Sequence, residues 1–168
     1  MSISLTGCLD TITGGEGGLG GVGSNVGEER REVVTTYDDA LAARNDATET
    51  RNTGVKLFNA GEHARAMESI ETALGGYEDA EASFAEAAEL ATALTEEEAA
   101  SICDVAREET ATQIEATEAA LAAATAAEEG ADASTINEHV TEFQEIEAEA
   151  SALTVEDTEV LAETLGLQ

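Results

Sequence analysis

Apolar residues recur three or four positions apart along most of this chain, which is the spacing of one face of an α-helix. The pattern predicts main helices over about 28–58, 62–93, 96–129 and 135–153, and a short last helix over 155–165. The fourth helix carries the clearest apolar stripe: Ile136, Val140, Phe143, Ile146, Ala150 and Leu153. The first helix is less regular, because its middle, residues 44–52, is polar.

Turn residues separate these stretches. Residues 59–61 (Asn-Ala-Gly) end the first helix, since Asn and Gly tolerate the left-handed conformation of a helix C-terminus. Thr95 with Glu98 reads as a capping box that starts the third helix, and Ser134 as the N-cap of the fourth. The Gly75–Gly76 pair inside the second helix predicts either a kink or a close crossing of another helix.

Long helices joined by short turns pack antiparallel against their neighbours. We therefore expect an all-α fold, an antiparallel bundle of four main long helices plus a short C-terminal helix, over residues 28–168. Residues 1–27 are rich in Gly and are predicted to be a flexible, disordered tether.

Composition limits the core of such a bundle. Apolar residues make up 42% of the chain, but many are alanine, aromatic residues are 3%, and Trp is absent. The core must be thin layers of Ala, Leu, Ile and Val, which suits closely spaced helices. High charge with few aromatics is also typical of a disordered acidic chain, but the periodic apolar positions favour a folded one.

The charge of the chain indicates its solvent. There are 37 acidic and 7 basic residues, a formal net charge of -30, and Lys56 is the single lysine. This composition resembles that of haloarchaeal proteins, which work in molar salt and hold hydrated cations at an acidic surface. Such a surface repels phosphate backbones, so we expect no nucleic-acid partner. The sequence contains no run of about 20 apolar residues, which is the length that a membrane-spanning helix needs.

The charge is unevenly distributed. Residues 30–65 hold six of the seven basic residues and are neutral overall, whereas residues 66–168 hold Arg107 alone against 27 acidic residues. One interpretation is that the first helix lies beside the acidic helices and relieves their repulsion. The other is a docking face for a protein partner or for self-association, formed by Arg44, Arg51, Lys56 and Arg65.

Cys8 gives the most specific functional motif. Leu5-Thr6-Gly7-Cys8 resembles the lipobox of lipoproteins, in which the cysteine is lipidated, and a Gly-rich tether follows it. A lipoprotein signal also has basic and apolar regions before this motif, and here only residues 1–4 precede it. The resemblance implies a lipid anchor at the cell envelope; the alternative is a free thiol in a disordered tail.

Other reactive residues do not converge on a catalytic, cofactor or metal site. Cys103 lies on the apolar side of the third helix and is expected to be a small buried hydrophobe. His63 and His139 lack the Glu-x-x-His spacing of di-iron bundles. We therefore predict no catalytic residue, no cofactor and no bound metal.

Residues 54–73 resemble one tetratricopeptide repeat, a helical hairpin, at these positions: Gly54, Leu57, Gly61, His63, Ala66, Ile70 and Ala73. The leading hypothesis is a non-enzymatic helical structural or interaction module of a halophilic archaeon, anchored to the cell envelope through Cys8. The alternative is a cytoplasmic, tetratricopeptide-like scaffold or adaptor that binds a protein partner through the first hairpin.

Overall fold

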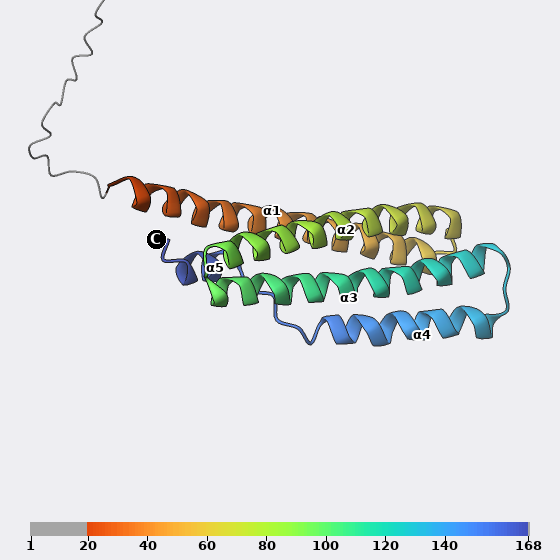
Figure 1. Ribbon diagram of the computed structural model, residues 1–168. Coiled ribbons are helices and arrows are strands. Elements are labelled where there is room, and N and C mark those ends of the chain that lie inside the picture. The colour runs from red at the N-terminus through yellow and green to blue at the C-terminus, as the bar shows by residue number, and fades with distance from the viewer. Residues whose placement is uncertain (1–19, 168) are drawn as a thin grey trace, which may run out of the picture.

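The computed structural model describes residues 20–167, and this part of the chain consists of helices and connections without any strand. The helices are α1 (Gly20–Asn59), α2 (His63–Ala93), α3 (Glu97–Glu128), α4 (Ala133–Ala150) and α5 (Thr158–Thr164). The predicted all-α fold of four main helices and a short C-terminal one is confirmed (Figure 1).

Each long helix runs antiparallel to the one before it and packs against it (Figure 1). The shorter α4 lies along only the part of α3 nearest the turn that joins them. At the other end of the bundle α5 takes its place and packs against α1 and α3.

The first helix begins earlier than predicted. Its backbone is already helical at Gly20 rather than at Glu28, so residues 20–27 belong to α1 and not to a tether. The remainder of the predicted tether, residues 1–19, lies outside the described residues. Once a helix is nucleated, each added residue gains a backbone hydrogen bond, so the amphipathic body of α1 can extend back through glycines of low helix propensity.

The end of α1 was predicted correctly, but the predicted capping box at Thr95 is wrong. Gly61 has φ 78° and ends α1 as predicted. Thr95 is not an N-cap: it has φ 60°, and its amide donates to Thr92 O at 2.9 Å while the Glu96 amide donates to Ala91 O at 3.0 Å. Thr95 thus occupies the left-handed position that ends α2, and a residue in that conformation cannot also start α3.

The starts of the last two helices also differ from the sequence pattern. Asp132, not Ser134, is the N-cap of α4, and its Oδ1 accepts hydrogen bonds from the amides of Ser134 at 2.9 Å and Thr135 at 3.0 Å. The carboxylate accepts from the amides two and three residues after it, as an N-cap side chain does, so α4 begins two residues earlier than a Ser134 cap implies. The last helix begins at Thr158, later than the predicted residue 155, and follows Asp157 as its N-cap.

The core divides into two apolar clusters along the bundle. The larger one, near α5, includes Tyr37 and Phe84, whose ring centroids lie 5.2 Å apart. The smaller one lies near the α1–α2 turn and is built around Ile70 and Phe143. Between the two clusters α1 and α3 bury several polar residues beside Ala47 and Ala116; the polar ones are Arg51, Glu109, Thr110, Gln113 and Thr117.

Glycines allow α1 and α2 to cross closely. A Cβ on Gly54 would lie 2.6 Å from Ile70 Cγ1 and 3.2 Å from the backbone oxygen of Ala66. A Cβ on Gly76 would lie 3.1 Å from Ala47 Cβ, whereas one on Gly75 would meet nothing within 4 Å. Since α2 runs unbroken through both residues, Gly76 marks a close crossing and not a helix break.

Candidate functional site

A chain of polar side chains crosses the middle of the bundle, and it begins with an ion pair between α1 and α3. Arg44 donates from Nε to Glu109 Oε2 at 2.9 Å and from Nη2 to Glu109 Oε1 at 2.5 Å. The Glu109 side chain is 1% exposed and that of Arg44 is 22% exposed. Such two-point pairing of a guanidinium and a carboxylate is strong and directional, and the hydrogen bond to Glu109 raises the pKa of Arg44.

The chain continues through Gln113 to α4. Gln113 Nε2 donates to Glu109 Oε1 at 2.8 Å, and its Oε1 accepts a hydrogen bond from Arg51 Nη1. Arg51 Nη2 in turn reaches Glu147 Oε1 at 2.8 Å. The side chain of Arg51 is only 3% exposed and that of Glu147 is 38% exposed. The buried cation thus pairs with a partly exposed carboxylate, and its contacts link three helices.

Aromatic rings enclose the buried guanidinium. The Arg51 Cζ atom lies 5.8 Å from the ring centroid of Tyr77 and 5.5 Å from that of Phe143, within the range of a cation–π interaction. The Tyr77 hydroxyl and Thr48 Oγ1 share a hydrogen bond of 2.8 Å. Burial raises the pKa of the Tyr77 phenol, so this hydroxyl stays protonated near neutral pH.

The predicted docking face is divided by the structure. Arg44 and Arg51 turn inward to the polar chain, so they do not form an exposed face with the other two residues. Lys56 is exposed on α1, and Arg65 on α2 is exposed and pairs with Glu62. The other interpretation, that α1 relieves the repulsion of the acidic helices, agrees with the Arg44 and Arg51 pairs and with a third pair between Arg30 and Glu96.

Only one of the two cysteines lies within the described residues. Cys8, the predicted lipidation residue, lies outside the described residues. Cys103 is a fully buried free thiol in the larger apolar cluster, as predicted. Burial, and then the charge of Asp104, raises the pKa of the Cys103 thiol to about 12.

The histidines lie on different helices. His63 packs against Phe58, with ring centroids 5.4 Å apart, and His139 lies 3.5 Å from Glu142 on the same face of α4. Within residues 20–167, no three side chains of His, Cys, Asp or Glu come together as metal ligands. No helix among these residues combines the length and the apolar character needed to cross a bilayer.

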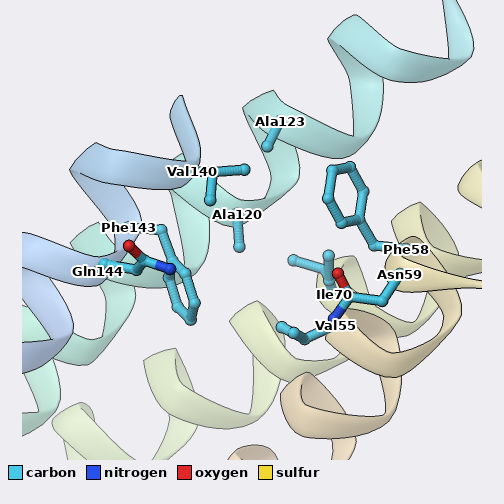
Figure 2. A pocket seen from close by; sticks show the side chains of 9 residues that line it. All are labelled: Val55, Phe58, Asn59, Ile70, Ala120, Ala123, Val140, Phe143 and Gln144. Carbon is cyan, nitrogen blue, oxygen red and sulfur yellow. The ribbon is translucent and has the colours of Figure 1, made fainter. Parts of the chain in front are cut away.

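A small cavity of about 100 Å³ lies where the four main helices surround the smaller apolar cluster (Figure 2). Phe58 of α1 and Phe143 of α4 lie on opposite sides of it, and Ala120 of α3 lies between them. The amide side chains of Asn59 and Gln144 complete the lining and are exposed to solvent. The cavity is thus an apolar space with hydrogen-bonding groups at its mouth.

The sequence pattern did not single out Glu109, Gln113 and Glu147, because they stand among 37 acidic residues and many other polar positions. A signal was present for the first two, because they continue the helical spacing of Cys103 and Ala106, which are buried. A polar residue within an apolar stripe indicates a buried partner. No protein-family model, curated protein or solved structure matches this chain.

Proposed function

We propose that this chain is a non-enzymatic helical structural or interaction module of a halophilic archaeon, held at the cell envelope by a lipid on Cys8. The observation that carries the proposal is the direction of its charges. Arginines of α1 face inward to carboxylates of α3 and α4, which leaves an outer surface dominated by acidic residues. Such a surface suits molar salt, where the Debye length falls to about 3 Å.

The polar interior supports a structural role over a catalytic one. Glu109 accepts hydrogen bonds from both Arg44 and Gln113, so its lone pairs are engaged by the fold itself. A general base or nucleophile needs a free lone pair that a substrate can reach. The two-point pairing of Arg44 with Glu109 is directional, which supports a role in fixing how α1 and α3 align.

The anchor is tested by mass spectrometry of the protein isolated from its native membranes. We expect an N-terminal peptide that begins at Cys8 and carries the added mass of a lipid. A Cys8→Ser variant is the matched control, and it should move from the membrane fraction to the soluble fraction. Recovery of an intact Met1 with an unmodified Cys8 thiol would contradict the anchor.

The second candidate, a cytoplasmic scaffold resembling a tetratricopeptide hairpin, is favoured by the close crossing of α1 and α2 at Gly54. On this alternative, Lys56 and Arg65 are the exposed cations that a protein partner would contact. A pull-down in molar KCl compares the wild type with a Lys56→Glu, Arg65→Glu double variant. Loss of a specific partner, together with a soluble wild-type protein, would favour this function; unchanged binding would exclude the face.

A further inference from the structure

The cavity of Figure 2 exists because small residues of α3 face a gap between α1 and α4. The backbones of α1 and α4 do not approach each other closely, although each packs along its neighbour in the chain. Opposite this gap α3 contributes Ala120 and Ala123, which are 7% and 2% exposed. Their methyl groups leave the space of about 100 Å³ unfilled.

The walls of the cavity make it a poor site for water. Its inner lining is hydrocarbon from Val55, Phe58, Ile70, Val140 and Phe143. A buried water needs about two to four polar partners, and a dry apolar cavity of about 150 Å³ is known to bind benzene. An apolar group that enters this space therefore displaces little well-bound water.

The size and the rim of the cavity define the ligand. A space of about 100 Å³ matches a single six-membered ring better than a fused bicycle. Phe58 and Phe143 on opposite sides offer ring edges and faces to an aromatic guest. The amides of Asn59 and Gln144 lie at the mouth, where they can pair with one hydroxyl group.

From these observations we propose that the cavity between α1 and α4 binds a small single-ring aromatic molecule that carries one hydroxyl group. The ring lies between Phe58 and Phe143, and the hydroxyl meets Asn59 or Gln144. This site is independent of the lipid anchor, because it lies wholly within the helical bundle.

The probe is phenol, added to the full chain in 2 M KCl and followed by methyl NMR signals of Val55, Ile70 and Val140. For a ligand with so few atoms we expect a saturable shift with a dissociation constant on the order of 1 mM. 2-Naphthol should bind at least tenfold more weakly than phenol in the same titration, because its second ring exceeds a space of about 100 Å³. Shifts that fail to saturate by about 10 mM phenol would overturn the proposal.

Filling the cavity is the sharper test. An Ala120→Leu variant places an isobutyl group in the space, and it should raise the melting temperature while weakening phenol binding at least tenfold. Ala148→Leu, on the exposed side of α4, is the matched control and should bind as the wild type does. If Ala120→Leu loses its helical circular dichroism, Ala123→Leu places the same isobutyl group in the space from another lining position of α3. If a folded variant with the filled cavity binds phenol as strongly as the wild type does, phenol binds elsewhere and this site is excluded.

Discussion

Glu109 of α3, buried between two apolar clusters, is held by both Nε and Nη2 of Arg44 from α1. Removing one partner of a buried ion pair leaves the other charge without compensation, which costs about 3–5 kcal/mol. We therefore expect Arg44→Ala to lower the free energy of unfolding by an amount in this range. Chemical denaturation in 2 M KCl measures it.

The matched control is the surface pair of Arg107 and Asp104, whose atoms lie 3.3 Å apart and whose side chains are 47% and 54% exposed. Exposed pairs contribute roughly 0–1 kcal/mol, so Arg107→Ala should have little effect. Equal losses from the two arginine variants would mean that the Arg44 pair is not a special feature of the interior.

A second prediction concerns Gly54, where α1 crosses α2. In an isolated helix, alanine is better than glycine by about 1 kcal/mol. Here the added methyl group would lie 2.6 Å from Ile70 Cγ1, and overpacking of this kind costs about 1–3 kcal/mol. Gly54→Ala should therefore lower the melting temperature.

Gly75→Ala is the control for that variant, because its methyl group would meet nothing within 4 Å. Only helix propensity acts there, so this variant should raise stability by about 0.5–1 kcal/mol. A Gly54→Ala protein as stable as Gly75→Ala would show that the helices can separate at no cost.

A third prediction is that low salt loosens α4 first. This helix contains five glutamates and neither lysine nor arginine, and the ion pair from Arg51 to Glu147 joins it to a cation of α1. As KCl falls from about 2 M to 0.1 M the repulsion from α3 is less screened. Hydrogen exchange should show α4 amides losing protection before those of α2, while total helical circular dichroism decreases.

Arg51→Gln should move this loss of α4 protection to higher salt, since the variant removes the charge that holds Glu147. Lys56→Gln removes one positive charge at an exposed position of the same helix and is the control. If both variants shift the transition equally, net charge and not the Arg51 pair governs α4.

A fourth prediction concerns alkaline pH. Burial raises the pKa of Cys103 from 9.0 to about 12, so between these values the unfolded chain binds fewer protons than the folded one. Stability is then fully present below about pH 9 and falls as pH rises toward 12. Burial also raises the pKa values of Tyr37 and Tyr77, which adds to the loss above about pH 10.

The contribution of the thiol is measured by denaturation at several pH values in a Cys8→Ser background. The Cys103→Ala variant should show a flatter dependence between pH 9 and 10 and keep the decline at higher pH. The slope is compared and not the absolute stability, because the substitution also removes a buried atom. An unchanged slope would show that the buried thiol does not contribute.

The sequence predicted the helices well because their signal is local. Apolar spacing located α2 and α3 to within a few residues, and Gly61 ended α1 where expected. The helix starts were less accurate, since Thr95 has a side chain typical of an N-cap but the backbone role of a terminating residue. That choice depends on where the next helix must go, which no local pattern encodes.

The polar middle of α1 shows the same limit. Residues 44–52 weakened the predicted helix because Arg44 and Arg51 interrupt its apolar face. Both are inward positions whose partners stand more than 60 residues away along the chain, on α3. The pairing arises only in the folded bundle. For the same reason, the sequence could not show that Arg44 and Arg51 lie apart from the exposed Lys56 and Arg65.

The concentration of basic residues in α1 has a consequence for the order of events in the cell. Translation delivers the N-terminal helix first, so its arginines leave the ribosome before most of the acidic residues are made. Arg44 and Arg51 are therefore already made when Glu109 and Glu147, the carboxylates with which they pair, are added to the chain.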